Sequence, residues 1–315
     1  MRLVFMGSPA EVVSPLRQLI AMSESGTHTV VGVVSQPARP FGRKQILTDP
    51  PLASFAKQAG LPVWQPEKAS DPNFLASLRH MAPDVIITAA YGQILSEEFL
   101  KIPTRATINI HPSMLPAYRG ATPVPAALLD GCPSTGVSIL FTVKALDAGN
   151  IILQQEFSIG EHETAGALTE RLFHASGPLL EEALHKLSAP DFKGHAQDEN
   201  RVTFCRKISK QDGCIDWQKQ ARRLFCEYKA YSPWPGIFTN LGSQRVLIEE
   251  CRLADATPQS LAPGEFLFDK ESKALLVGSS EGQLLISRLK PAGSKSLDAQ
   301  AFWNGMKIAG TGQFT

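Results

Sequence analysis

The stretch INIHPSMLPAYRG, residues 108–120, begins as an apolar strand and ends in a loop that contains proline, tyrosine, arginine and glycine. Strand alternation places Thr107, Asn109 and His111 on one face and the two isoleucines between them on the other. An amide and an imidazole that point the same way at a strand end can stabilise a developing oxyanion, and the imidazole can relay a proton. Alternatively, Asn109 caps a turn and His111 is an ordinary hydrogen-bonded histidine at the rim of a sheet.

Short apolar runs alternate with helical patterns through the first half of the chain. Residues 3–6, 30–35, 85–89, 107–110 and 137–143 are predicted to be strands, with helix-like segments between them. This rhythm predicts an α/β fold with a Rossmann-like, mostly parallel sheet that helices cover on both faces. In such sheets ligands bind beyond the carboxyl ends of the strands.

The first strand ends in a single glycine, Gly7, where dinucleotide-binding proteins carry a G-x-G-x-x-G motif. Ser8 as N-cap, Pro9 at the first helical position and Glu11 three residues after the cap predict a capping box instead. The pattern argues against a nicotinamide-dependent dehydrogenase.

The second half of the chain has a different pattern. Apolar periodicity is lost around residues 188–206, which we expect to be a linker, and a helical pattern follows that includes Trp217, Leu224 and Tyr228. About five short strands come next, separated by turn residues, and they predict a small OB-like β-barrel. The predicted domains are 1–188, a linker at 189–206, and 207–315.

Composition indicates a globular protein. The chain has 315 residues, 43% of them hydrophobic, and no apolar run long enough to span a membrane or serve as a signal peptide, so we expect a cytoplasmic monomer. The net charge of +1 hides an asymmetry: residues 1–205 carry −3 and residues 206–315 carry +4. The basic C-terminal part fits either a polyanionic partner or plain solvated surface. The five cysteines lack C-x-x-C spacing, so we expect buried thiols and no metal site.

A second polar position follows the strand predicted at residues 137–143. The run GVSILFTVKALDAGN breaks at Asp147, which we expect at a strand end in the same half as His111. Asp147 could pair with His111 or accept a proton from an attacking nucleophile, although aspartate before a small residue and glycine is also ordinary turn chemistry. No serine, cysteine or lysine accompanies these residues in a nucleophile motif, which favours direct transfer over a covalent intermediate.

Two motifs, in order, resemble those of the folate-dependent formyltransferases. INIHPSMLPAYRG is similar to the family's N-x-H-P-S-L-L-P-x-Y-R-G signature, and VKALDAGNI to its L-D-x-G-D motif. QPARPFGRKQ, AAYGQIL, RKISKQDGCIDW and YSPWPG resemble further motifs of the members that act on transfer RNA, so the resemblance covers nearly the whole chain. Two positions depart from the pattern: Met114 replaces leucine, and Asn150 replaces aspartate.

The resemblance implies a site for each substrate. It assigns Asn109, His111 and Asp147, hereafter the trio, to catalysis, with 10-formyltetrahydrofolate as the formyl donor. It also implies a folate-binding set, which comprises Ser113, Met114, Leu115, Pro116, Ile87, Tyr91 and Gly92. The acceptor would be initiator methionyl-tRNA, contacted by Arg39, Arg43, Lys44 and Lys207. Arg39, Arg43 and Lys44 lie in a segment, residues 36–49, with no helical or strand period, typical of an exposed basic loop.

Other functions share parts of this pattern. A sugar-nucleotide N-formyltransferase would have the same trio but would not need the basic loop at residues 36–49. A folate hydrolase or dehydrogenase module would also share the trio, and the dehydrogenase would need a longer chain. A non-enzymatic RNA-binding module would use the sheet only as a scaffold.

Overall fold

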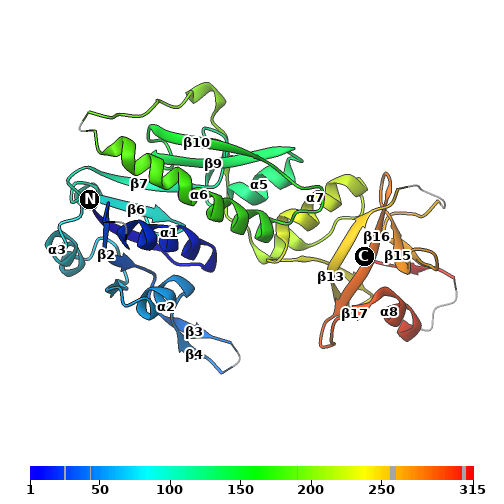
Figure 1. The fold of residues 1–315 in the computed structure, drawn as a ribbon. Coiled ribbons are helices and arrows are strands. Elements are labelled where there is room, and N and C mark those ends of the chain that lie inside the picture. Colours follow the sequence, from blue (N-terminus) through cyan, green and yellow to red (C-terminus); the bar gives the residue numbers. More distant parts are fainter. Residues whose placement is uncertain (25, 43, 190, 256–259, 307–309) are drawn as a thin grey trace. The chain divides into compact units, whose positions relative to one another are not determined.

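The computed structural model describes residues 1–24, 26–42, 44–189, 191–255, 260–306 and 310–315 (Figure 1). The chain forms two compact units. The first unit comprises Met1–Pro123, Ser134–Ser158 and Thr169–Cys205, and the second comprises Val124–Pro133, Ile159–Leu168 and Arg206–Thr315. Among the described residues, no helix combines the length and apolar character needed to cross a membrane.

The first unit is built on a seven-stranded sheet with the strand order β10-β9-β7-β6-β1-β2-β5. Its strands are β1 (Arg2–Gly7), β2 (Thr29–Val34), β5 (Val63–Trp64), β6 (Val85–Ala89), β7 (Ala106–His111), β9 (Ser134–Phe141) and β10 (Ile151–Ser158). The five strands from β5 to β7 are parallel, whereas β9 and β10 are antiparallel to their neighbours. The predicted mostly parallel α/β fold is confirmed.

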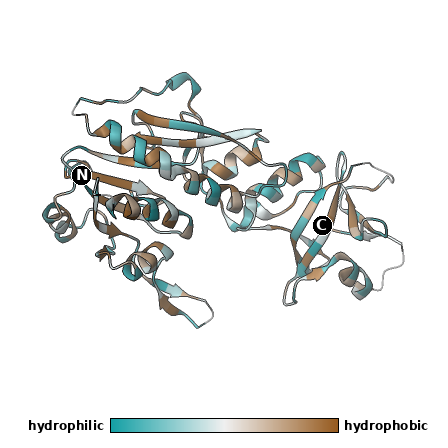
Figure 2. Cartoon of the chain, in the orientation of Figure 1, coloured by the Kyte–Doolittle hydropathy of each residue, from teal (hydrophilic) through white to brown (hydrophobic). Residues whose placement is uncertain are grey.

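Helices pack on both faces of this sheet. They are α1 (Val13–Glu24), α2 (Pro51–Gln58), α3 (Pro72–His80), α4 (Glu97–Leu100) and α6 (Ala165–Leu187), the last with residues 169–187 in this unit. One core cluster joins Val4, Met6 and Ile86 of the strands to Phe74 of α3 and Phe99 of α4. Figure 2 shows apolar residues concentrated on the central strands and alternating with polar ones along the helices, as expected for a buried sheet under amphipathic helices.

The predicted capping box after β1 is wrong. Pro9 is extended (φ −74°, ψ 171°), a short 3-10 turn follows at Ala10–Val12, and α1 begins only at Val13. The Ser8 hydroxyl instead accepts a hydrogen bond of 3.1 Å from the backbone N–H of Gln36. A tertiary partner beyond β2 therefore takes the place of the local cap.

The sequence predicted a mostly parallel sheet in which β9 would end at the same edge as β7, but β9 runs antiparallel to β7. Because β9 is antiparallel to β7, its last residue, Phe141, lies opposite Ile108 and not beside the carboxyl end of β7. The loop at 142–150 leads from β9 to β10 and must turn back for Asp147 to approach His111. The carboxylate therefore reaches the site on a returning loop, not from a second parallel strand end.

The second unit holds an antiparallel half-barrel of strand order β12-β13-β16-β15-β14-β18, with β17 paired to β16. Its strands are β12 (Ile237–Leu241), β13 (Gln244–Leu253), β14 (Glu265–Asp269), β15 (Ala274–Gly278), β16 (Gln283–Pro291), β17 (Leu297–Asp298) and β18 (Gly312–Gln313). Reciprocal backbone hydrogen bonds of 2.9 and 3.0 Å between Asn240 and Thr315 join the two edges. This confirms the predicted small barrel domain and adds two short strands.

Among its described residues, the second unit has three α-helices besides the first residues of α6. They are α5 (Pro123–Leu129), α7 (Ala221–Tyr231) and α8 (Ala299–Met306). Helix α7 is the one predicted from the pattern around Leu224, but Trp217 precedes it and stacks on Phe314 inside the barrel. The cysteines are free and each residue is partly buried, and burial raises the pKa of the Cys251 thiol.

Candidate active site

Asn109 and His111 lie near the carboxyl end of β7, between β6 and β9. Asn109 pairs with Thr88 of β6, and His111 pairs with Ser138 of β9. The two isoleucines of the motif are fully buried on the opposite face, so burial fixes the register of β7. The face predicted for Asn109 and His111 follows from this register.

Thr88 orients the Asn109 side chain. Its hydroxyl lies 2.9 Å from Asn109 Oδ1 and 3.1 Å from the carbonyl oxygen of Ile108. Donation to Oδ1 turns the amide nitrogen of Asn109 towards Asp147, where Nδ2 lies 3.4 Å from Oδ1. Sequence reasoning missed Thr88, although it is the one hydroxyl in the otherwise apolar strand β6.

His111 is buried, with only 5% of its side chain exposed. Its Nε2 lies 2.9 Å from the carbonyl oxygen of Tyr118, which can only accept, so this nitrogen carries a proton. Its Nδ1 lies 3.7 Å from Oδ2 of Asp147. The imidazole is therefore held by a backbone carbonyl on one side and faces a carboxylate on the other.

Asp147 completes the group. Its side chain is 12% exposed, and Oδ2 accepts a hydrogen bond of 2.9 Å from the backbone N–H of Gly120. The structure thus brings the three predicted residues together: the Asn109 carboxamide and the His111 imidazole each lie within 3.7 Å of the Asp147 carboxylate.

Two glycines make this convergence possible. A Cβ atom at Gly149 would lie 1.7 Å from the carbonyl oxygen of Phe141, and one at Gly120 would lie 2.3 Å from that of Cys205. Gly120 also has φ +123°, a conformation that side chains with a Cβ rarely adopt. The two motif glycines are thus required because backbone segments meet there.

The loop that follows β7, residues 112–120, is hereafter called the signature loop. Residues 195–205 of the predicted linker lie against it. The strand β11 (Phe204–Cys205) pairs in parallel with β8 (Arg119–Gly120), and Arg119 N–H donates to the carbonyl of Thr203 over 2.9 Å. Asn150, the residue that departs from the family pattern, donates from Nδ2 to the carbonyl of Lys193 over 2.9 Å. Aspartate could not make this bond, because it has no N–H to donate.

The residues predicted to line a folate site form a buried loop after β7. Ser113 is fully buried, and its hydroxyl donates to the carbonyl of Ala117 over 2.7 Å. Leu115 is 4% exposed, and its N–H donates to the Ser138 hydroxyl over 3.1 Å. Met114 packs over Gly136. The Ser113 hydroxyl and the backbone of Ser113 and Leu115 are thus bonded within the protein and hold the loop in shape.

The second group of predicted folate residues follows β6. Ile87 is fully buried, and Tyr91 is 5% exposed within the core cluster of α3 and α4. Burial raises the pKa of Tyr91 to about 12, and its hydroxyl has no hydrogen-bond partner among the described residues. Gly92 adopts φ +83°, and Gln36 Nε2 donates to the carbonyl of Tyr91 over 2.9 Å. Ile87 and Tyr91 are thus part of the core, and the Gln36 side chain holds the backbone before Gly92.

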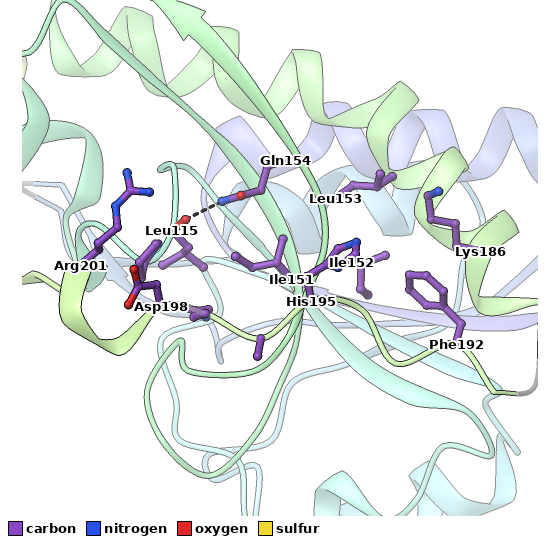
Figure 3. A pocket seen from close by; sticks show the side chains of 13 residues that line it. Leu115, Ile151, Ile152, Leu153, Gln154, Lys186, Phe192, His195, Asp198 and Arg201 are labelled. Atoms are coloured by element: carbon purple, nitrogen blue, oxygen red, sulfur yellow. Dashed lines mark hydrogen bonds between the residues drawn. The ribbon is translucent and has the colours of Figure 1, made fainter.

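A pocket of about 460 Å³ lies beside Leu115 and Pro116 (Figure 3). Leu115, Pro116, the first residues of β10, Lys186 of α6 and residues 195–198 line it. Gln154 of β10 donates to the carbonyl of Leu115 over 2.8 Å at its edge. None of the trio lines this pocket, although Gln197, one of its walls, contacts the loop that carries Asp147.

The segment at residues 36–49 is not a plain loop. It contains a two-stranded hairpin, β3 (Arg39–Phe41) and β4 (Ile46–Thr48), whose residues are all exposed. Arg39 pairs with Glu67 over 2.6 Å, and Lys44 is exposed, whereas Arg43 lies outside the described residues. The hairpin also carries an exposed apolar surface that the sequence did not predict. It consists of Phe41, Ile46 and Leu47, which are between 61 and 75% exposed. Lys207, the remaining predicted contact, is an exposed residue of the second unit.

The geometry of the trio suits attack of a nucleophile on a carbonyl carbon. The carboxamide N–H of Asn109 and the imidazole of His111 can stabilise negative charge on the carbonyl oxygen. The carboxylate of Asp147 can accept a proton from the nucleophile. These are the groups that a group-transfer enzyme without a covalent intermediate needs.

Comparison with known families agrees with this chemistry. The family described as Formyl transferase matches residues 1–184, and that described as Formyl transferase, C-terminal domain, matches residues 207–307. The chain belongs to the formyl transferase family, which confirms the resemblance found in the motifs.

Curated relatives that match nearly the whole length of this chain share one name. Methionyl-tRNA formyltransferase of Listeria innocua is 39% identical over 305 residues, which cover 96% of this chain and 95% of the relative. The protein of the same name from Roseiflexus castenholzii is 38% identical over 310 residues, or 98% and 97% of the two chains. Within its family the chain therefore groups with the methionyl-tRNA formyltransferases.

Solved structures share the fold at lower identity. An N-formyltransferase from Helicobacter canadensis, in complex with folinic acid and dTDP-3-aminofucose, matches with a TM-score of 0.68 and 15% identity over 90% of this chain and 98% of its own. HypX from Aquifex aeolicus, in complex with tetrahydrofolic acid, matches with a TM-score of 0.66 and 19% identity over 96% of this chain and 46% of its own. At these identities the likeness concerns the fold alone.

Proposed function

We propose that this protein transfers the formyl group of 10-formyltetrahydrofolate to the α-amino group of methionine on initiator methionyl-tRNA. The observation that carries the proposal is the likeness to methionyl-tRNA formyltransferases over 96% of the chain, together with the cluster formed by the trio. The reaction would take place in the cytoplasm, with the protein as a monomer.

The trio would act on a single tetrahedral intermediate. The neutral α-amine attacks the formyl carbon, so that a carbon–nitrogen bond forms and the carbonyl electrons move to oxygen. An N–H of Asn109 and the imidazolium of His111 hold that oxyanion. Asp147 takes the proton that the amine loses, directly or through water. The oxyanion then re-forms the carbonyl, the bond between the formyl carbon and N10 of the folate breaks, and the same proton passes from Asp147 to N10, again directly or through water.

Besides stabilising charge in the transition state, the protein would lower the barrier by holding the two substrates in position. Holding amine and donor together can account for roughly 7–11 kcal/mol of the barrier. The segments Ser113–Pro116 and Tyr91–Gly92 would border the folate, and the hydrogen bonds that the Ser113, Leu115 and Tyr91 carbonyls accept within the protein would hold these segments in shape. Main-chain groups held by buried side chains suit a rigid, planar pterin.

The tRNA would be bound by basic residues of both units. Arg39, Arg43 and Lys44 of the 36–49 segment would contact the acceptor end, and Lys207 would contact the backbone elsewhere. Such phosphate contacts give affinity that falls steeply with salt. Exposed Phe41 at the edge of the hairpin would offer an apolar surface to an unpaired base.

A sugar-nucleotide N-formyltransferase is the second candidate, since the fold neighbours include enzymes of that kind. One experiment separates the two. The protein is incubated with 10-formyltetrahydrofolate labelled in the formyl group and either charged initiator tRNA or a nucleotide-linked amino sugar. We expect label on the methionine of the tRNA; label on the sugar alone would replace the proposal with the second candidate.

A further inference from the structure

Gln197 holds the turn that carries Asp147. From the segment before β11, its Nε2 donates to the carbonyl oxygen of Asp147 over 2.7 Å and to that of Gly149 over 2.8 Å. One side-chain amide thus joins two carbonyls of the same turn. Without it, both carbonyls would need water or another donor.

Arg119 fixes the direction of that amide. The guanidinium is buried, with the residue 4% exposed, and its Nε and Nη2 donate to Oε1 of Gln197 over 3.0 and 2.9 Å. Nη2 also donates to Glu199 over 2.9 Å. Because the guanidinium has only donors, it requires the oxygen of Gln197 on its side and thereby turns the nitrogen towards Asp147.

These contacts close a ring around the trio. The residue before Arg119, Tyr118, accepts from His111, and the residue after it, Gly120, donates to the Asp147 carboxylate. The Arg119 side chain returns through Gln197 to the Asp147 carbonyl. Asp147 is therefore held at both its carboxylate and its backbone by one short stretch of chain.

The turn needs such support. Asp147 has φ +48°, in the left-handed region that residues with a side chain seldom occupy. It also sits on a loop that returns from the far end of β9. A loop of this kind, left unsupported, would relax into a commoner backbone conformation and carry the carboxylate away from His111.

We propose that Gln197, oriented by Arg119, is a positioning residue for the formyl transfer: it keeps the Asp147 turn in its left-handed conformation so that the carboxylate faces His111 and Asn109. The effect on catalysis rests on the proposed function, whereas the support of the turn does not. Gln197 touches no reacting atom, so its loss should slow the chemical step and leave substrate binding intact.

The test replaces Gln197 with methionine, which keeps the volume and removes the two bonds to the Asp147 turn together with the two that Arg119 donates to Gln197. Gln313→Met is the matched control, because Gln313 also spans two carbonyls, those of Pro263 (3.0 Å) and Phe314 (2.9 Å), within the second unit. Both variants lose a bridge between two carbonyls, but Gln197→Met also loses the two bonds from Arg119, so the unfolding temperature of each variant is measured beside its kcat. We expect kcat to fall about 10²-fold in Gln197→Met, as for a small misplacement of a catalytic group. The KM values of both substrates should stay within roughly twofold, and Gln313→Met should keep the wild-type kcat.

Amide hydrogen exchange supplies a readout that needs no activity. Exchange across residues 142–149 should be faster in Gln197→Met than in wild type and unchanged in Gln313→Met. Unchanged exchange, or an unchanged kcat in a folded Gln197→Met protein, overturns the inference. A wild-type protein that forms no formyl-methionyl-tRNA overturns the proposed function instead, and the exchange experiment then still decides whether Gln197 holds the turn.

Discussion

Replacing Asp147 with asparagine tests the trio most directly, because the two side chains have the same shape. The N–H of Gly120, 2.9 Å from Oδ2, requires an acceptor, so the amide oxygen of the new residue must take that place. Its nitrogen then lies where Oδ1 was, 3.4 Å from Nδ2 of Asn109, and two donors face each other.

The conflict has one local remedy. Asn109 can rotate its carboxamide while the Thr88 hydroxyl donates to the Ile108 carbonyl, 3.1 Å away. That rotation turns the N–H of Asn109 away from the reacting oxygen. The variant thus loses a proton acceptor, which contributes about 10²–10⁴ in rate, and also weakens an oxyanion donor. We expect kcat/KM to fall by at least about 10³-fold, a change of roughly 4 kcal/mol in the barrier.

The assay measures kcat/KM for formylation of initiator methionyl-tRNA at saturating folate donor. Asp71→Asn is the control, because Asp71 caps α3 by accepting from Asn73 and Phe74, and asparagine caps helices equally well. Activity of Asp147→Asn within about tenfold of wild type would refute the mechanism, since it would mean that neither the charge nor the orientation of Asn109 matters.

Further predictions concern the remaining parts of the site. Asn109→Ala or His111→Ala should abolish measurable turnover and leave tRNA affinity nearly intact; lost affinity together with a lowered unfolding temperature would indicate a folding defect. Thr88→Val, which keeps the shape but frees the carboxamide of Asn109, should lower kcat about tenfold with little change in KM, and an unaltered kcat would show that Thr88 does not orient the amide. Arg43→Ala should weaken tRNA binding and make it less sensitive to salt, which binding isotherms at several salt concentrations will show; an unchanged salt dependence would exclude the residue from the interface. The N–H of Arg2 and the hydroxyl of Thr104 lower the pKa of Asp84, so its stabilising effect, present at neutral pH, should be lost as pH falls below about 4; acid unfolding of Asp84→Asn should accordingly be less steep than that of wild type.

Local patterns predicted the part of the site that depends on one strand. Alternation in β7 placed Asn109 and His111 on one face, and the same rule identified the buried isoleucines between them. Periodicity likewise predicted β1, β2, β6, β7 and β9 of the first sheet and the five longer strands of the barrel, and it missed β5 and β10. These features depend on neighbours in sequence, which a single chain reveals.

Local sequence patterns could not predict hydrogen-bond partners that lie far apart in the sequence. Thr88 and Gln197 lie 21 and 50 residues from their partners Asn109 and Asp147, and no local spacing connects them. The antiparallel direction of β9 was also missed, since an apolar strand reads the same either way. Ser8 illustrates the reverse error: a good local cap sequence lost to a hydrogen bond with Gln36 after the next strand.

The interleaved division of the chain affects how the protein can be dissected. The second unit includes Val124–Pro133 and Ile159–Leu168, which precede its main body by many residues. Within that unit Arg223 of α7 bonds to the carbonyl of Leu129, and the N–H of Gly166 donates to the carbonyl of Ser232 over 3.0 Å. A fragment cut at residue 206 would lack these partners and would expose part of α7 to water. Studies of RNA binding by a severed C-terminal piece would therefore describe a damaged domain, so the intact polypeptide with point substitutions is the sounder material for such work.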